Sequence, residues 1–244
     1  MNEHIVSSYD EDIKDLQEQV VAMGGLVEKI WMDAMDCVKN ANDKAALQVI
    51  ESDKKIDSME LKIYDKSMRL LALRSPLASD LRIVVSAMRM ASSLERLGDH
   101  AKNIARREKL ISTGDHPEII SLLTRMYDLS HSALQQAINA YRNSNPGSAE
   151  EIRANDARVD ELFDSTVAIV LNLMAPKNPP LETEALASLL FIAKSLERMG
   201  DMTTNIAEII IFQETGSFPT DERPRGKDHQ GGLMESLAEK EKDI

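Results

Sequence analysis

The sequence has little cysteine, aromatic residue, glycine or proline, and these shortages exclude several classes of protein. Its 244 residues include one cysteine, so neither an internal disulfide framework nor a cysteine-based metal site can form. Aromatic residues make up 4% of the chain and apolar residues 43%, with 10 glycines and 8 prolines. A core of aliphatic and methionine side chains with few chain breakers is typical of helices packed on helices. We therefore predict an all-α protein.

Positive charge is also scarce, and no long apolar run is present. The formal net charge is −12, whereas nucleic-acid binding requires a basic surface. No segment approaches the roughly 20 apolar residues that a membrane span requires. The opening MNEHIVSSYDEDIKDL lacks the basic and apolar regions of a signal peptide. We expect a cytoplasmic protein that binds cations or a basic partner and no nucleic acid.

Apolar residues recur every three or four positions in six segments, which indicates six helices. The segments cover about 5–39, 43–73, 76–111, 118–142, 149–174 and 182–213. We interpret Ser75 and Pro76 as the N-cap and first residue of the third helix, and NSNPGS as a turn. From residue 216 onward we predict a polar, mobile tail with a short helix near 233–240.

The third and sixth helices contain two copies of one motif. SLERLGDHAKNIA at 93–105 matches SLERMGDMTTNIA at 195–207 in nine of thirteen positions. DKKID at 53–57 and DARVD at 156–160 are a weaker matching pair. These repeats indicate an internal duplication. We predict two homologous three-helix bundles, 1–113 and 114–215, packed side by side as six long antiparallel helices, with a tail at 216–244.

Each copy of the motif places two carboxylates four residues apart, an arrangement that costs a helix a few tenths of a kcal/mol. Glu95 and Asp99 share one helix face, and Asp53 and Asp57 share a face of the preceding helix. The midpoint of 53 and 99, like that of 57 and 95, is the proline at 76. An antiparallel hairpin folded at this proline therefore brings both acidic pairs to the same level.

The second half repeats this arrangement around the break at 176–179, with Asp156 and Asp160 facing Glu197 and Asp201. Crowded carboxylates are unfavourable unless a cation lies among them or their pKa values rise. Hard oxygen ligands suit Mg, Ca, Mn, Fe or Zn, and adjacent pairs can bridge several ions. The predicted metal ligands are Asp53, Asp57, Glu95, Asp99, Asp156, Asp160, Glu197 and Asp201.

Other interpretations of these residues stay open. Gly98 and Gly200 can admit a neighbouring helix or a metal, and Glu60 can join the first site. Arg96 and Arg198 can instead neutralise the carboxylates of a solvated face. The Glu-x-x-His of di-iron bundles, the phosphate loop and the nucleophile elbow are all missing. The alternatives to a metal-binding adaptor are a carboxylate-bridged metalloenzyme and a metal-free helical scaffold.

The sequence resembles the PhoU family of bacterial phosphate-signalling regulators over nearly all of residues 9–213. The resemblance rests on MGGLVEKI, DKKIDSME, SPLASDLRIVVSAMRM and the two copies of the SLER motif. It implies two three-helix bundles and multinuclear metal clusters, usually of iron or zinc, at the eight carboxylates named above. No enzymatic activity is implied.

The resemblance also implies partners and a regulatory role. The family represses the phosphate-starvation response and links the ATPase subunit of a phosphate ABC transporter to a sensor histidine kinase. Many members dimerise, so we expect a homodimer that meets the membrane only through its partners. Direct phosphate binding is not expected at the candidate metal sites, because both are anionic.

Overall fold

The computed structural model describes residues 2–40, 42–107, 110–111, 116–154, 157–174 and 180–220, and consists of helices joined by short connections. The helices are α1 (Asn2–Asn40), α2 (Asp43–Arg74), α3 (Ser79–Ala105), α4 (Pro117–Arg142), α5 (Pro146–Ala154), α6 (Ala157–Leu173) and α7 (Pro180–Thr215). None of the described helices is both long enough and apolar enough to cross a lipid bilayer.

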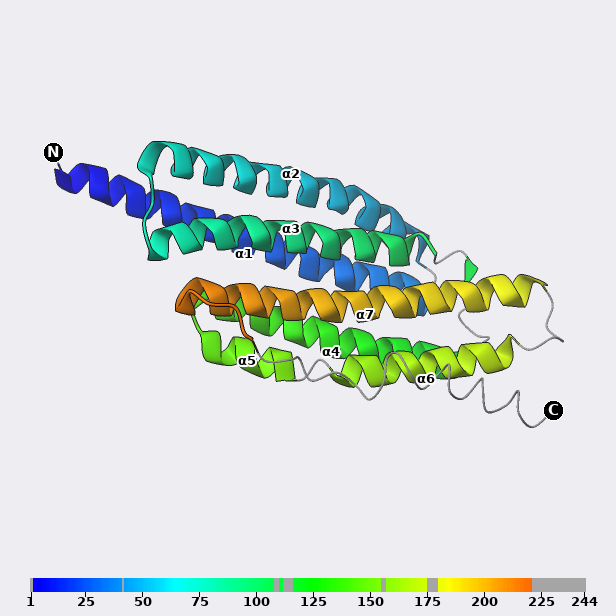
Figure 1. Cartoon of the computed structure of the whole chain (residues 1–244). Coiled ribbons are helices and arrows are strands. Elements are labelled where there is room, and N and C mark those ends of the chain that lie inside the picture. The colour runs from blue at the N-terminus through cyan, green and yellow to red at the C-terminus, as the bar shows by residue number, and fades with distance from the viewer. Residues whose placement is uncertain are drawn as a thin grey trace.

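The helices form two elongated bundles that lie side by side (Figure 1). The helices α1, α2 and α3 pack on one another, and α4, α5, α6 and α7 form the second bundle. The bundles meet where α3 packs on α7, with a smaller contact between α1 and α4. The colours of Figure 1 show that α3 and α7 run in opposite directions. The prediction of an all-α protein with two homologous bundles is confirmed.

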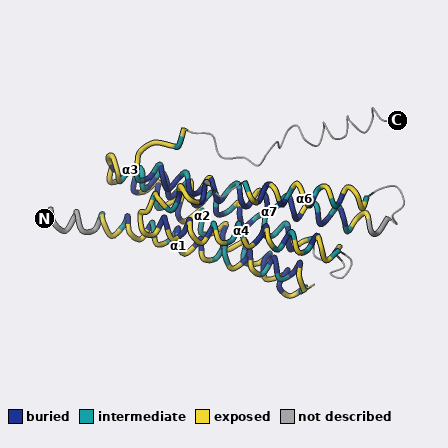
Figure 2. The backbone as a smooth tube through the Cα atoms, turned by 90° about the horizontal axis from the view of Figure 1, so that it is seen from below, coloured by how far each residue is buried: buried dark blue, intermediate teal, exposed yellow. Residues whose placement is uncertain are grey.

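The core fills the space between the helices, and the buried faces point inward (Figure 2). It consists mainly of Leu, Ile, Val, Met and Ala side chains, as the composition predicted. Trp31 is fully buried and donates a hydrogen bond from Nε1 to the carbonyl of Leu97, 3.2 Å away. This bond satisfies the indole N–H inside the apolar core and ties α1 to the middle of α3.

The connection between α2 and α3 differs from the prediction. Asn42 caps the start of α2, since its side chain accepts a hydrogen bond from the Ala45 N–H. At the other end Ser75 has the left-handed φ of 44° and caps the C-terminus of α2. Proline often follows such a C-cap because it cannot continue the helix. Pro76 therefore ends α2, and α3 begins at Ser79, three residues later than predicted.

The second half begins as predicted at α4, but its fifth predicted helix, 149–174, is described as two segments, α5 and α6. The helix α5 starts within the predicted NSNPGS turn. Asn145 Oδ1 accepts a hydrogen bond from the Ser148 N–H, and Pro146 occupies the first helical position, which suits a residue without an N–H. The break at 176–179 and the predicted tail helix at 233–240 lie outside the described residues.

Two adjacent glycines in α1 should respond in opposite ways to alanine. A Cβ at Gly24 would lie 2.5 Å from Cδ1 and 2.9 Å from Cγ1 of the buried Ile138 in α4, whereas a Cβ at Gly25 meets nothing within 4 Å. We expect Gly25→Ala to stabilise the protein by about 1 kcal/mol through helix propensity. Gly24→Ala should be less stable than Gly25→Ala by about 1–3 kcal/mol because of overpacking. Urea denaturation of both variants measures this difference, and equal stabilities would contradict the α1–α4 contact.

Candidate functional site

The first acidic cluster lies where α2 and α3 come closest. Gly98 is buried, and a Cβ at this position would lie 3.1 Å from Ile56 Cδ1 and 3.4 Å from Asp53 Oδ1. Its hydrogen therefore allows α2 to approach α3 more closely than any larger residue would. This contact buries Asp53, whose side chain is 4% exposed, while Asp99 on the next turn is 48% exposed.

A lysine that the sequence analysis did not select holds this cluster together. The Lys102 ammonium donates hydrogen bonds to Asp53 Oδ2 and to Asp99 Oδ1, the latter at 2.5 Å. Burial opposes the charge of Lys102, but the two hydrogen bonds prevail and raise the pKa of its ammonium group. The other oxygen of Asp53, Oδ1, is buried without a hydrogen-bond partner. The i, i+3 spacing of Asp99 and Lys102 was the available sequence signal.

The remaining carboxylates of the first half face the same cluster. Burial, then the charges of Asp99 and Glu60, raises the pKa of Glu95. Partial burial and the charge of Asp53 likewise raise the pKa of Asp57. These interactions show that the acidic faces of α2 and α3 lie at the same height along the hairpin. The equal distances of these residues from Pro76 in the sequence predicted this. The interactions also show that Glu60 belongs to the cluster.

The second half has a related but different arrangement on α6 and α7. Asp160 and Glu197 are buried, and Asp156 lies outside the described residues. Burial raises the pKa of Glu197 against an opposing hydrogen bond from Lys194, and the charges of Asp201 and Asp160 raise it further. The Lys194 Nζ lies 2.7 Å from Glu197 Oε2. A lysine thus compensates both clusters, but from a different position in each copy of the motif.

The donor atoms fit a hard cation in type, but they surround a lysine. Carboxylate oxygens are the ligands that Mg, Ca, Mn and Fe prefer, and the orphaned Asp53 Oδ1 offers a free lone pair. Within the described part of the chain, however, no three or more His, Cys, Asp or Glu side chains are grouped so as to hold a metal ion. Metal binding at the eight predicted residues therefore stays a prediction, and it requires Lys102 to move aside.

The arginines do not take the role that the alternative interpretation gave them. In the described residues, Arg96 forms no ion pair with a carboxylate, and Lys102 and Lys194 compensate the clusters instead. Arg96 lies about 100° around α3 from Glu95, because it is the next residue in the helix. It therefore lies at the edge of the acidic face, about 60° from Asp99, without pairing with it.

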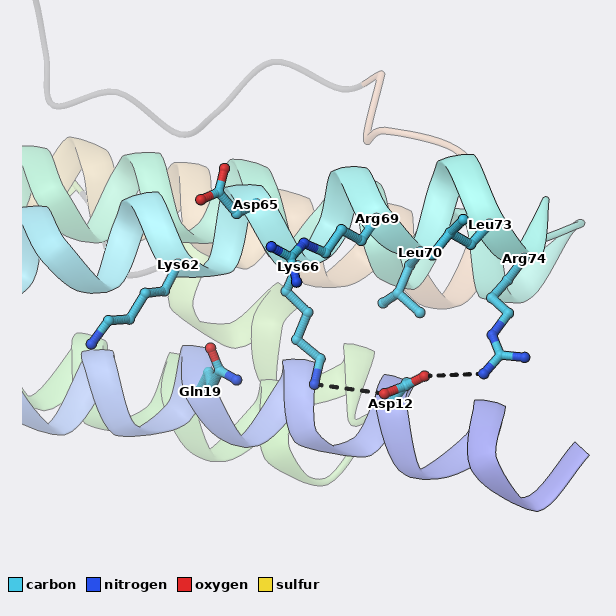
Figure 3. Close-up of a pocket in the computed structure, with 9 residues that line it drawn as sticks. All are labelled: Asp12, Gln19, Lys62, Asp65, Lys66, Arg69, Leu70, Leu73 and Arg74. Atoms are coloured by element: carbon cyan, nitrogen blue, oxygen red, sulfur yellow. Dashed lines mark ion pairs between the residues drawn. The ribbon is translucent and has the colours of Figure 1, made fainter. Parts of the chain in front are cut away.

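A hollow of about 700 Å³ between α1 and α2 was not predicted (Figure 3). Lys62, Lys66, Arg69 and Arg74 line it together with Asp12 and Asp65. Figure 3 shows Asp12 between Lys66 and Arg74, at 4.0 Å and 3.6 Å from their nitrogens. Lys66 also pairs with Asp15. The acidic side chains thus compensate Lys66 and Arg74 and leave the hollow basic, and the dispersed charges gave no sequence motif.

Comparisons with known proteins agree on one family. The PhoU domain profile matches residues 20–107 and 123–210. The phosphate-specific transport system accessory protein PhoU homolog of Zymomonas mobilis is 36% identical over 225 residues, which is 92% of this chain and 94% of the relative. The homolog of the same name from Caulobacter vibrioides is 37% identical over 226 residues, 92% and 97% of the two chains.

Two solved structures have the same fold. The crystal structure of PhoU from Pseudomonas aeruginosa is 31% identical, with a TM-score of 0.80 over 86% of this chain and all of that one. The phosphate transport system regulatory protein PhoU from Streptococcus pneumoniae is 28% identical, with a TM-score of 0.80 over 87% of this chain and all of that one. The similarity thus covers both bundles.

The raised pKa of Glu95 predicts a pH-dependent effect of Glu95→Gln in the presence of a chelator. A carboxyl with a raised pKa binds its proton more tightly in the folded state, so stability falls as the pH rises from the ordinary value of about 4.3 through the folded value. We expect Glu95→Gln to stabilise the protein at pH 7.5 by roughly 0.5–1 kcal/mol. The gain should shrink as the pH falls to about 4 and below, where wild type becomes protonated in both states.

The exposed Glu51 on α2 provides the control, because it lies outside the cluster. Glu51→Gln should change the free energy of unfolding little at either pH. Thermal denaturation of both variants and wild type with EDTA at several pH values measures the effect. A destabilising Glu95→Gln at pH 7.5 would contradict the mutual repulsion of these carboxylates.

Proposed function

The chain belongs to the PhoU family, and on this premise we propose that it is a negative regulator of phosphate uptake and of the phosphate-starvation response. It acts as an adaptor between the ATPase subunit of a phosphate ABC transporter and a sensor histidine kinase. The names of its relatives, accessory proteins of a phosphate-specific transport system, support the transport part of this proposal. We further propose a cytoplasmic homodimer that reaches the membrane through these partners.

We propose that the two acidic clusters hold metal ions during this function. The ligands are Asp53, Asp57, Glu95 and Asp99 in the first half, and Asp156, Asp160, Glu197 and Asp201 in the second. The raised pKa of Glu95, caused by burial and by neighbouring carboxylates, and the unfilled hydrogen-bond acceptor Asp53 Oδ1 support this assignment, because a bound cation would favour the charged form of the first and occupy the second. Lys102 supplies the positive charge when no metal is bound. A bound cation would stabilise the fold and link the stability of each bundle to metal supply.

An exposed apolar face on α2 supports the adaptor role. Leu61, Tyr64 and Met68 are 65%, 50% and 45% exposed and follow one another at helical spacing. They begin one turn after Asp57, so an apolar stripe adjoins the acidic cluster. Apolar patches rimmed by charge are typical of protein–protein contacts. A partner segment with apolar and basic side chains fits this surface.

The same clusters argue against the metalloenzyme alternative. A reactive metal site requires an enclosed pocket with open coordination positions. Asp57 is exposed and Asp99 is 48% exposed, so the first cluster opens to solvent on the face of a helical hairpin. We therefore propose a structural or regulatory metal rather than a catalytic one.

If Lys102 and a metal ion share one place, removing the lysine should strengthen metal binding. We expect Lys102→Met to raise the affinity for Mn²⁺ on the order of tenfold, because the cation no longer displaces a charge-assisted hydrogen bond of about 1.5–3 kcal/mol. Isothermal titration calorimetry of protein stripped with chelator measures the affinity. The exposed Lys55 on α2 provides the control, and Lys55→Met should bind as wild type does.

The combined variant Asp53→Asn with Asp99→Asn should lose binding at the first cluster. Circular dichroism melting shows whether each variant is folded before it is titrated. Equal affinities of wild type, Lys102→Met and the double asparagine variant would remove the first cluster from the metal assignment.

The regulatory proposal predicts a loss of repression. Deletion of the gene in its own host should switch on a reporter for phosphate-acquisition genes in phosphate-rich medium, and the wild-type gene should restore repression. Replacing Leu61, Tyr64 and Met68 with serine should leave the fold intact, since all three are exposed, but weaken repression if this stripe contacts the partner.

A variant in which three exposed lysines or glutamates elsewhere on the surface are replaced with serine is the matched control for the triple serine variant. An unchanged reporter in the deletion strain would refute the signalling role itself. Full repression by the triple serine variant would instead leave that role standing and move the contact to another surface.

A further inference from the structure

A second hollow lies at the boundary between the bundles, away from the acidic clusters. It has a volume of about 380 Å³ and opens between α3 and α7. Arg89, Ser92, Ser93 and Arg96 line it from α3, and Asn205 and Glu208 from α7. A water molecule takes about 30 Å³ of liquid, so the hollow has room for a small polyatomic ion with several waters.

Helical spacing explains why these donors meet. Arg89, Ser92, Ser93 and Arg96 follow the i, i+3, i+4, i+7 pattern and therefore share one face of α3. Glu95 and Asp99 belong to the neighbouring face, which α2 covers. One helix thus carries a face of hydrogen-bond donors beside a face of carboxylates, and Arg96 and Asp99 lie where the two faces adjoin.

Two guanidinium groups in this hollow have no acidic partner in the part of the chain that the structure describes. Within the described residues, neither Arg89 nor Arg96 forms an ion pair, although the whole chain has a net charge of −12. The Arg89 guanidinium lies 4.5 Å from the ring centroid of Phe218, and such stacking leaves its N–H edges available. Among the described residues that line the hollow, Glu208 is the only carboxylate.

The charge of Glu208 is partly compensated. Arg153, whose side chain is 4% exposed, has its Nε 3.5 Å from Glu208 Oε1, and its Nη1 also pairs with Glu150 at 3.0 Å. Even if Glu208 carries its full charge, the two guanidinium groups of Arg89 and Arg96 leave a net positive charge among the residues that line the hollow. The hollow presents two guanidinium groups and two hydroxyl groups. Proteins use this set of hydrogen-bond donors to bind tetrahedral oxyanions.

Both copies of the duplicated motif contribute polar residues to the hollow. Ser93, Arg96 and Asn103 recur as Ser195, Arg198 and Asn205. Because α3 and α7 run antiparallel (Figure 1), the serine and arginine of the first copy meet the asparagine of the second. The polar residues of the motif that the carboxylate clusters do not use thus come together across the boundary.

We propose that this hollow binds a tetrahedral oxyanion of the phosphate class, either free inorganic phosphate or the phosphoryl group of a nucleotide. Arg89 and Arg96 supply bidentate hydrogen bonds, and Ser92 and Ser93 donate from their hydroxyl groups. The site is distinct from the carboxylate clusters, which repel phosphate. Since α3 belongs to one bundle and α7 to the other, the bound ion stabilises their contact.

The basic hollow between α1 and α2 provides a useful control. Its Lys66 and Arg74 are paired with Asp12, and it keeps positive charge on Lys62 and Arg69, but no serine or threonine hydroxyl is among its described lining residues (Figure 3). Arg69 in this hollow is exposed on α2, as Arg96 is exposed on α3. Removing either arginine changes the net charge equally.

The test is binding of radiolabelled orthophosphate to the full chain by equilibrium dialysis, with EDTA present so that no metal recruits the anion. We expect saturable binding that Arg96→Gln weakens at least tenfold, the loss of one charge-assisted interaction. Arg96→Lys should give an intermediate affinity, because lysine keeps the positive charge but cannot form the bidentate hydrogen bonds of a guanidinium group. Arg69→Gln should bind as wild type does. Competition with unlabelled AMP identifies the source of the phosphoryl group.

Orthophosphate binding that AMP does not displace supports the free ion, and AMP binding with the same dependence on Arg96 supports a nucleotide. The proposal is overturned if neither ligand saturates the protein, if Arg96→Gln binds as wild type does, or if Arg69→Gln weakens binding equally. The measurement concerns binding alone, so it is independent of the regulatory role.

Discussion

The close approach of α2 to α3 at Gly98 is the constraint on which the first acidic cluster depends. Without a Cβ at this position, Ile56 and Asp53 come within van der Waals reach of the α3 backbone. The approach buries a carboxylate that would otherwise be solvated, and burial of a charge requires compensation. Lys102 provides it from the next turn of α3. The glycine that weakens the helix thus permits the close contact of two helices that carry buried charge.

The sequence was sufficient for the hairpin register, because side chains four apart share a helix face and an antiparallel pair folds symmetrically about its turn. It was insufficient at the turn itself. Ser75 and Pro76 suit a helix start or a helix end equally well, and only packing decides that α2 ends there. Lys102 was missed for a similar reason. Its i, i+3 spacing from Asp99 was visible, but its contact with Asp53 depends on a residue 49 positions away.

The two halves keep the fold of the repeat and differ in how they balance its charge. Lys102 lies three residues after Asp99, whereas Lys194 lies three residues before Glu197. In the opposite copy these positions are Thr204 and Ser92. Lys194 also lies 5.0 Å from the ring centroid of Phe163, which replaces Glu60 of the first half. The duplicated carboxylates therefore have different surroundings in the two halves. The sequence of a single copy of the motif does not reveal this difference.

The equivalent helices α3 and α7 form the boundary between the two halves, where they pack against each other in an antiparallel orientation. A contact of equivalent surfaces related in this way is the isologous interface of a two-fold symmetric dimer. The single chain therefore contains within itself the kind of contact that two copies of one bundle would form, and its two halves can differ in sequence on either side of that pseudo-two-fold axis.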